Sequence, residues 1–463
     1  MKNLLSKKLS ICLASVVSGT MPFMLASFTS CSNANTIQFA NYESYMDNDL
    51  LRHLEDTYDA QFQWFTISEM IETKFEHTYD MAVPSGYELC KLYSKGWLQK
   101  IDWKAILGIP QDQSFDPMSL FSQPAQEMIK EMNELFKQDS PDIIPNDFDV
   151  LDYGIPYFAQ SFCFVYKGEE LTFYKNGSLT PTDEPNWADI FYTISPKGKY
   201  ADRFGGRIGM LDDSRSIYDV ARVVQTIEQY PEDQSQWTNE MPPNSTIDDL
   251  KETFKAVTNK AQSNWYRLST DSGQIARILA DHGDHGYNAA LAWSGDALYA
   301  AQGAGEYESY TGEQMHTIKP KGASLDEIDF IVINKKNEHN TSKLSRIYKM
   351  IYDICFDTWK VNSEDELLAL SSDGSHFKYW SMQNWNTVSY VPMLKNIFDI
   401  VSQPKSKYWD DYAASDDELT RQLMTSLITI PTLPFSKSLF GRPLTDLENS
   451  NSHWAWLESR GNL

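Results

Sequence analysis

The segment YDMAVPSGYEL places a hydroxyl group and an aromatic ring directly after a short apolar run. Residues 79–83 predict a buried strand, which Pro84, Ser85 and Gly86 end before a helix begins. Ser85 and Tyr87 therefore stand at the carboxyl end of a strand, where an open α/β sheet usually meets its ligand. Pro-Ser-Gly is also ordinary turn chemistry with serine as an N-cap, and the segment taken alone favours that plainer interpretation.

Two further segments contain residue types that bind ligands or metals. GRIGMLDD predicts a strand that ends in Asp212 and Asp213, although an aspartate in that place also caps a following helix. DHGDHG, residues 281–286, places His282 and His285 beside two acids, but its spacing is not that of a metal-ligand set and suits a loop. The chain has no P-loop, nucleophile elbow or HExxH motif. We therefore predict no metal site, no cofactor and no catalytic residues.

The elements that must position Ser85 and Tyr87 alternate between strand and helix. TIQFANY and AQFQWF predict strands, and DNDLLRHLEDTY between them predicts a helix with Asp47 as its N-cap. TISEMIETKFE predicts a second helix, because Thr66 and Glu69 have the spacing of a capping box. The strand at 79–83 and a helix that closes at Gly96 follow. This order predicts a doubly wound sheet whose loops point toward one crevice.

The rest of the chain continues as a mixture of strands and helices. Regions near 108–147 and 231–275 look like insertions, and 153–168 predicts two short extended runs around Pro156. SIYDVARVVQTI and KLSRIYKMIYDICF predict amphipathic helices, whereas YNAALAWSG and IDFIVINKK predict strands.

The composition limits the classes of protein that the chain can belong to. Its 463 residues suffice for two large lobes, and 41% hydrophobic with 22% charged residues is a globular composition. The formal net charge of -24 repels phosphate backbones, so we predict no nucleic-acid partner. Apart from Cys12 and Cys31, the cysteines are Cys90, Cys163 and Cys355, too few and too widely spaced for a disulfide framework.

The N-terminus resembles a bacterial lipoprotein signal. Lys2, Lys7 and Lys8 precede a mostly apolar run with no acidic residue before Cys31. Two small residues directly precede Cys31, although Phe28 stands where the usual motif has Leu. We expect Cys31 to be lipidated, with palmitate among its modifications, and to anchor the protein on the extracytoplasmic face of the cell membrane. The alternative is an uncleaved membrane anchor.

Several segments, taken in order, resemble the extracellular spermidine/putrescine-binding proteins of polyamine ABC importers. The most specific is YDMAVPSGYELCKLYSKGWLQKID, and FANYESY, GIPY, NWADIF, GMLDDSR, LAWSGDA, IDFIVINKK and SYVP complete the ordered set. The resemblance covers residues 37–110 and 151–400. It implies an α/β, type II periplasmic-binding-protein fold, with two lobes and a ligand cleft at the hinge.

The resemblance also implies how the chain divides between the lobes. Residues 1–30 would be the signal peptide. The first lobe would comprise 31–156 and 329–392. The second lobe would comprise 157–328 and then 393–463, which includes a C-terminal extension.

The family's ligand-contacting residues fall on one set of positions in this chain. Its aromatic contacts fall on Tyr42, Tyr45, Tyr87, Trp293 and Tyr390. Its ligand-binding serine falls on Ser85, and two of its carboxylates fall on Asp213 and Asp329. Aromatic faces would pack the methylenes and attract the charges of a polyamine, and carboxylates would accept charge-assisted hydrogen bonds from its ammonium groups. Asp213 and Asp329 are expected to serve different ammonium groups.

Three positions depart from the family pattern. Ser216 stands where the family typically has a ligand-contacting Glu, Glu327 stands near a Trp position, and Tyr42 replaces a Trp. One explanation is that Glu327 or Glu43 compensates for the lost carboxylate, so both are further candidates for ligand binding. The alternative is that the ligand has changed.

The implied function is that of a solute-binding protein, not an enzyme, which delivers spermidine or putrescine to an ABC transporter. Its partners would be the polyamine, the permease and ATPase subunits, and the membrane through the lipid anchor. Two alternatives stay open at this point. The same fold could bind another organic cation such as thiamine, or a sugar, or the protein could be a surface lipoprotein for adhesion or scaffolding.

Overall fold

The structure is a computed structural model, and it describes most of the chain after the N-terminal segment. The described residues are 35–65, 68–139, 144–175, 178, 180–281, 283, 285–304, 315–411, 418–428 and 436–462. The predicted signal peptide, Cys31, Thr66 and His282 lie outside these ranges, so the expectations about them stay predictions. Residues from Ile37 onward form one compact unit, which is the subject of the following description.

The first three strands form the predicted alternating pattern. β1 (Ile37–Tyr42) pairs in parallel with β2 (Ala60–Phe65) and with β3 (Met81–Ala82). Between β1 and β2 lies α1 (Asn48–Tyr58), and the Asp47 carboxylate caps it as predicted by accepting the N–H groups of Asp49 and Leu50. After β3 comes α3 (Gly86–Ser94).

Two local predictions are wrong. The helix expected over TISEMIETKFE is a 3-10 turn at Ser68–Met70 followed by the short helix α2 (Glu72–Phe75). The two extended runs expected around Pro156 are one continuous strand, β4 (Gly154–Lys167). The strand passes through Pro156 because its register against β11 (Gly322–Ile333) shifts there, and proline, which lacks an N–H group, is tolerated at such a bulge.

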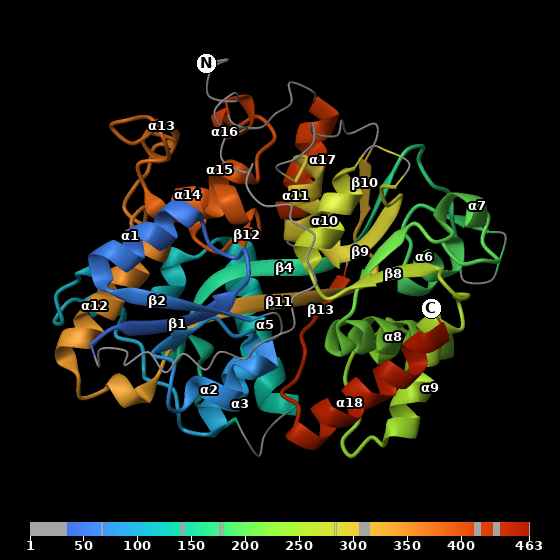
Figure 1. The fold of residues 1–463 in the computed structure, drawn as a ribbon, viewed down its shortest axis with the longest axis horizontal. Coiled ribbons are helices and arrows are strands. Elements are labelled where there is room, and N and C mark those ends of the chain that lie inside the picture. The colour runs from blue at the N-terminus through green and yellow to red at the C-terminus, as the bar shows by residue number, and fades with distance from the viewer. Residues whose placement is uncertain are drawn as a thin grey trace, which may run out of the picture. The chain divides into compact units, whose positions relative to one another are not determined.

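β4 and β11 connect two lobes of one mixed sheet, as Figure 1 shows. The strand order is β2-β1-β3-β11-β4-β9-β7-β8, where β7 is Ile208–Leu211, β8 is Tyr266–Ser269 and β9 is Ala289–Trp293. We call the part around β1, β2 and β3 the first lobe and the part around β7, β8 and β9 the second lobe. The exact lobe boundaries predicted from the sequence stay a prediction.

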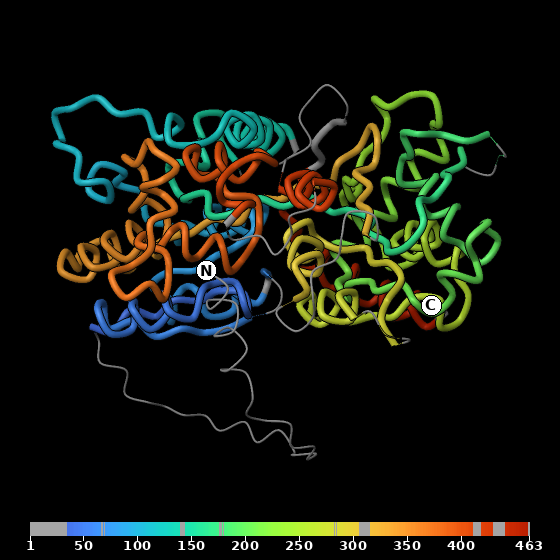
Figure 2. The backbone as a smooth tube through the Cα atoms, turned by 90° about the horizontal axis from the view of Figure 1, so that it is seen from above, coloured from blue at the N-terminus to red at the C-terminus, as the bar shows by residue number. Residues whose placement is uncertain are grey.

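Helices cover both lobes, and segments distant in sequence meet in each. In Figure 2 the segments near residues 40–100 lie with those near 330–400, whereas those near 170–300 gather on the opposite side. The first lobe has α4 (Trp103–Leu107), α5 (Gln123–Asp139), α12 (Thr341–Ile351), α13 (Glu364–Leu367) and α14 (Trp380–Val388). Helices α15 (Lys395–Val401) and α16 (Lys407–Asp411) follow α14 in the chain. The second lobe has α6 (Trp187–Thr193), α7 (Ala201–Phe204), α8 (Ser214–Gln229), α9 (Ile247–Thr258), α10 (Ser272–Ala280) and α11 (Ser294–Ala301).

The final part of the chain returns to the second lobe. After α17 (Glu418–Ile428), strand β13 (Ser436–Leu439) pairs in parallel with the start of β11. The last long helix, α18 (Asp446–Ser459), then packs against α8 and α9 (Figure 1). Short strands complete the fold: β5 (Phe173–Tyr174), β6 (Pro181–Thr182), β10 (Met315–Ile318) and β12 (Val391–Pro392).

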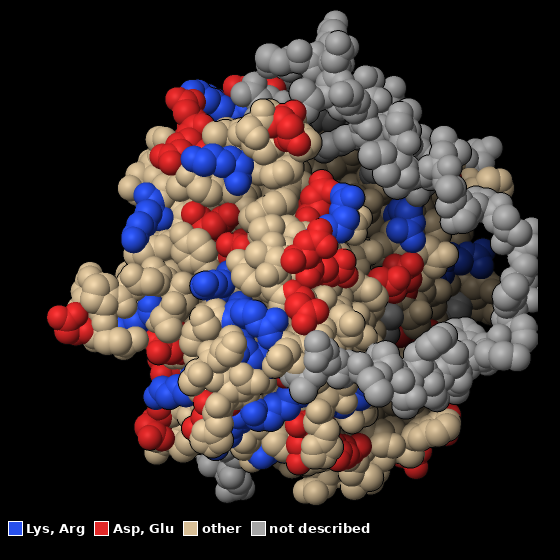
Figure 3. Space-filling model, turned by 60° about the vertical axis from the view of Figure 1, so that its left-hand side comes forward, with Lys and Arg blue, Asp and Glu red and all other residues tan. Residues whose placement is uncertain are grey.

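The surface and the cysteines agree with the composition. On the face in Figure 3, Lys and Arg side chains lie among Asp and Glu side chains. Cys90, Cys163 and Cys355 are free and buried. Among the described residues, no helix has both the length and the apolar composition that are needed to cross a bilayer.

Candidate ligand-binding cleft

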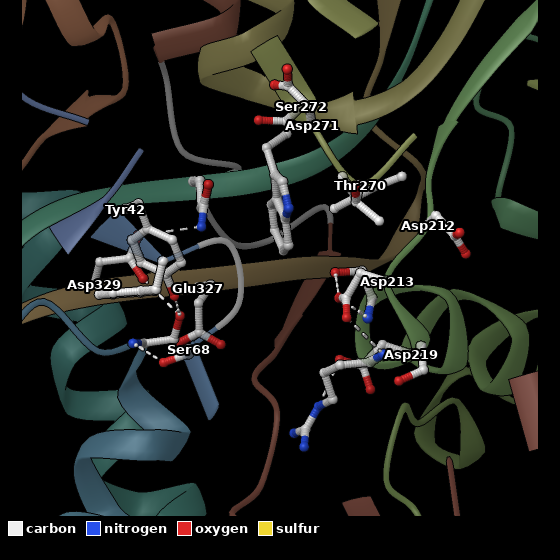
Figure 4. Close-up of a pocket in the computed structure, with 18 of the residues that line it drawn as sticks. Tyr42, Ser68, Asp212, Asp213, Asp219, Thr270, Asp271, Ser272, Glu327 and Asp329 are labelled. Carbon is white, nitrogen blue, oxygen red and sulfur yellow. Dashed lines mark hydrogen bonds and ion pairs between the residues drawn. The ribbon is translucent and has the colours of Figure 1, made fainter. Parts of the chain in front are cut away.

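A cleft of about 490 Å³ lies between the lobes and is lined by both of them. All ten residues that the resemblance singled out line it: Tyr42, Glu43, Tyr45, Ser85, Tyr87, Asp213, Trp293, Glu327, Asp329 and Tyr390. Figure 4 shows Tyr42, Ser68, Glu327 and Asp329 on one side and Asp212, Asp213, Asp219 and Thr270 on the other. The structure thus brings the predicted residues together, and their role in binding stays a prediction.

We name the two sides of the cleft after the lobes. The first-lobe wall is Tyr42, Glu43, Tyr45, Phe65, Ser68, Ser85, Tyr87, Gln160, Glu327, Asp329 and Tyr390. The second-lobe wall is Leu211, Asp212, Asp213, Ser214, Arg215, Ser216, Asp219, Thr270, Asp271, Ser272, Trp293, His453, Trp456, Leu457 and Arg460.

At the centre of the first-lobe wall, the hydroxyl group of Ser85 points at a buried carboxylate. Ser85 occupies the N-cap position of α3 with an extended backbone, but its side chain makes no capping hydrogen bond. Its Oγ instead donates to Oδ1 of Asp329 at 2.8 Å. The Tyr42 hydroxyl lies 2.9 Å from the same Oγ and must donate to it, because the single Ser85 proton is already used. The two hydroxyls therefore form a relay that ends on Asp329.

Glu327 takes over the capping of α3. Its Oε1 accepts the N–H of Gly86, the first residue of the helix, at 2.9 Å and the N–H of Ile328 at 3.2 Å. A β-carbon on Gly86 would lie 3.1 Å from Oε1 and 2.8 Å from the sulfur of Met132, so glycine allows the carboxyl group to come this close. Burial and the neighbouring Asp329 raise the pKa of Glu327 well above its usual value. Burial therefore disfavours the charged form of Glu327.

Tyr45 holds Asp329 from the other side. Its hydroxyl donates to Oδ2 of Asp329 at 2.8 Å, and its ring meets the rings of Tyr42 and Tyr390 edge to face at centroid distances of 5.6 and 5.0 Å. Asp329 is 1% exposed, and burial raises its pKa to about 6 despite the hydrogen bonds from Ser85 and Tyr45. At neutral pH this carboxylate is charged and surrounded by aromatic rings and neutral donors.

The second-lobe wall also begins with a strand-to-helix turn. Asp213 follows β7 and caps α8: its Oδ1 accepts the N–H of Arg215 at 3.3 Å, and its Oδ2 accepts the N–H of Ser216 at 2.8 Å. The Ser216 hydroxyl donates to the same Oδ2 at 2.6 Å. Ser216, at the position of the family's Glu, therefore supports the Asp213 cap in this chain.

Two predicted aromatic contacts have protein neighbours of their own. The Tyr87 ring lies 4.4 Å from the guanidinium carbon of Arg215, a cation–π contact between α3 and α8. Trp293, at the end of β9, meets Phe162 edge to face at 5.1 Å and is half-buried. Tyr87 therefore already interacts with a cation of the protein, whereas Trp293 extends the aromatic lining on the second lobe.

The sequence analysis missed the part of the wall that α18 provides. His453, Trp456, Leu457 and Arg460 line the cleft, and the Trp456 indole N–H donates to Oδ1 of Asp212 at 2.8 Å. Arg460 forms an ion pair with the same carboxylate. The capping box of Thr445 and Glu448 could have predicted this helix from the sequence. Nothing in the sequence pattern indicated that it returns to the cleft.

Comparison with known proteins supports the fold and the general class. A curated relative, the spermidine/putrescine-binding periplasmic protein of Escherichia coli (strain K12), is 21% identical over 327 residues, which span 67% of this chain and 71% of the relative. A structure named for a spermidine/putrescine ABC transporter from Listeria monocytogenes matches with a TM-score of 0.51 and 16% identity, over 92% of this chain and 99% of the other. The resemblance stated from the sequence is confirmed.

A thiaminase has the same fold. Thiaminase I from Bacillus thiaminolyticus matches with a TM-score of 0.52 and 13% identity, over 92% of this chain and 99% of the enzyme. At such identities the likeness establishes the fold alone, and a shared fold leaves the chemistry to the site.

The fold is the two-lobed α/β fold of periplasmic binding proteins, as predicted, with the cleft at the place where the lobes meet. One family model, described as "Hypothetical lipoprotein (MG045 family)", matches residues 1–426. The chain therefore belongs to the MG045 family of hypothetical lipoproteins.

Proposed function

We propose that this protein is the substrate-binding component of an ABC importer and that its cleft binds a polyamine, spermidine or putrescine. The observation on which the proposal depends is the environment of Asp329. Its carboxylate is buried, receives hydrogen bonds from the neutral hydroxyls of Ser85 and Tyr45, and lies among aromatic rings. Burying a carboxylate without a cation is unfavourable, so an ammonium group that binds beside Asp329 would form an ion pair with it and offset that cost.

The aromatic lining suits the rest of a polyamine. Tyr42, Tyr45, Tyr390 and Trp293 offer apolar surface to methylene groups and ring faces to ammonium groups, at about 0.5–2 kcal/mol for each cation–π contact. The name of the Escherichia coli relative indicates the same ligand class. Delivery to a permease and its ATPase, and a lipid anchor at Cys31, complete the proposal, and membership in a lipoprotein family supports an extracytoplasmic, membrane-associated location.

Binding is favoured over catalysis by the chemistry of the cleft. The Ser85 hydroxyl donates to the buried carboxylate of Asp329, but the described residues place no histidine beside it that could act as a base. The fold shared with a thiaminase makes thiamine the most informative competing ligand.

Titration calorimetry on the full-length protein in detergent tests the proposal with putrescine, spermidine, thiamine and maltose. We expect the polyamines to bind and Asp329→Asn to weaken that binding about ten- to a hundredfold, the scale of one hydrogen bond to a charged group. The variant keeps the size of the side chain and accepts from Ser85 as before. Equal polyamine affinity in the parent and the variant would show that Asp329 does not bind the ligand. Tighter binding of thiamine or maltose than of either polyamine would refute the proposal that the ligand is a polyamine.

A further inference from the structure

The two walls of the cleft differ in their charge. The described residues of the first-lobe wall include three carboxylates and no Lys, Arg or His. The second-lobe wall includes four carboxylates together with Arg215, Arg460 and His453. Both of the arginines that line the cleft therefore belong to one wall.

Two of the four second-lobe carboxylates are paired with those arginines. Asp212 forms an ion pair with Arg460 and also accepts the Trp456 indole N–H at 2.8 Å. Asp219 lies 3.7 Å from Nε of Arg215. An ammonium group near either carboxylate would meet a guanidinium group that is already in place.

The other two second-lobe carboxylates cap helices. Asp213 accepts two backbone N–H groups of α8 and the hydroxyl of Ser216. Asp271 accepts the N–H of Gln274 at 3.0 Å at the start of α10 and pairs with Arg277 at 3.3 Å. The positive end of the helix dipole compensates a carboxylate in this position, so its charge is already partly balanced.

On the first-lobe wall, one buried carboxylate remains for a cation. Glu43 is exposed at the rim of the cleft, and Glu327 caps α3 through Gly86. Asp329 has three hydrogen bonds, all from neutral groups, and the longest is 3.4 Å from Gln160. Among the described residues, no basic side chain forms an ion pair with it.

We infer that the cleft pairs only one ammonium group of its ligand with a carboxylate, at Asp329, and that the other end of the ligand lies against the second-lobe wall without a carboxylate partner. This inference rests on the proposed function and specifies how many ammonium groups of the ligand the cleft recognises by their charge. A second ammonium group would lose its hydration beside Arg215 and Arg460 without gaining an unengaged carboxylate. It should therefore add little to the affinity.

Two ligands that differ only at one end test the inference. Putrescine has four carbons and an ammonium group at each end, whereas 4-amino-1-butanol replaces one ammonium group with a hydroxyl. Calorimetry on the full-length protein in detergent at pH 7.5 should give affinities within fivefold of each other. Putrescine binding more than fivefold tighter overturns the inference and leaves the proposed function in place. If neither amine binds, the inference and the proposed function both fail.

A charge change directly after the end of α18 provides the converse test. Arg460→Gln removes the cation that pairs with Asp212, so the second-lobe wall should gain a carboxylate whose charge is not paired, although it still accepts the Trp456 N–H. We expect the affinity ratio of putrescine to 4-amino-1-butanol to rise at least fivefold in this variant. Arg460→Lys keeps the positive charge and should keep the parental ratio. An unchanged ratio in Arg460→Gln would overturn the inference, because pairing with Arg460 would then not be what makes Asp212 unavailable.

Discussion

Ser85 and Asp213 stand at corresponding places in the two lobes, yet their side chains form hydrogen bonds with different kinds of partner. Each follows a buried strand of a parallel pair, occupies the N-cap position of the next helix with an extended backbone, and lines the cleft. The Asp213 carboxylate caps its own helix. The Ser85 hydroxyl donates to Asp329 instead, and the first N–H of the helix, that of Gly86, is accepted by Glu327, 241 residues further along the chain.

The difference shows when an N-cap residue is available to a ligand site. A helix N-terminus needs acceptors for its free N–H groups, and a polar N-cap side chain normally supplies one. Where another side chain supplies that acceptor, the N-cap side chain is released for other interactions. We call residues 83–86 the Ser85 turn and residues 212–214 the Asp213 turn, and four predictions test the contrast between them.

The largest effect is expected at the remote cap of the Ser85 turn. Glu327→Ala leaves the buried N–H of Gly86 without its acceptor, which should lower the free energy of unfolding by about 1–3 kcal/mol. Glu327→Gln keeps an oxygen acceptor and resembles the protonated form that burial favours, so it should stay close to the parent. Urea denaturation of both variants measures the difference. Equal stabilities would mean that Glu327 does not cap α3.

The pH dependence of binding should follow Asp329. Burial raises its pKa to about 6 in the free protein, and an ammonium ligand favours the ionised form. Affinity should therefore be nearly constant above pH 6 and fall as the pH decreases below it, by about tenfold between pH 7 and pH 5. Calorimetry across this range should also detect proton release on binding at pH 5. An affinity independent of pH would show that the cation is bound elsewhere.

The Asp213 turn should respond in stability. Asp213→Ala removes the cap of α8 and should lower the free energy of unfolding by about 1 kcal/mol, the usual cost of losing an N-cap. Asp213→Asn is the matched control, because asparagine caps helices about as well as aspartate. Thermal and urea unfolding give the comparison. If both variants are as stable as the parent, the capping role assigned to Asp213 is incorrect.

The smallest effect is expected at Ser85 itself. Ser85→Ala removes one donor to Asp329, and that hydrogen bond helps to keep the pKa of Asp329 from rising further. Polyamine affinity should fall about two- to tenfold, since a single hydrogen bond contributes roughly 0.5–1.5 kcal/mol. The free energy of unfolding should change little, because Ser85 makes no capping bond. A loss of stability comparable to that of Asp213→Ala would remove the contrast between the two turns.

The sequence predicted the first lobe well because its signals are local. Periodicity and turn residues located β1, α1, β2 and α3, and Asp47 caps α1 as expected. The resemblance then placed ten candidate residues that meet in one cleft. These inferences needed only the order of the segments along the chain.

Interactions between distant segments could not be predicted in the same way. Ser85 and Asp213 both resemble N-caps in the sequence, and only the position of Glu327 decides which side chain is released. β4 passes through Pro156 because of its register against β11. The hydrophobic pattern of one segment does not show which residues of another strand it will pair with. Pairing of Arg460 with Asp212 likewise depends on where α18 returns.

The cleft is lined by segments far apart in the chain and can be completed only after Arg460 has been synthesised. Tyr42 is among the first residues of the wall to leave the ribosome and Arg460 is the last. At about 5–20 residues per second, roughly 20–80 s separate the two. A nascent chain that has not reached residue 329 lacks Asp329 and therefore the carboxylate on which the proposed polyamine site depends.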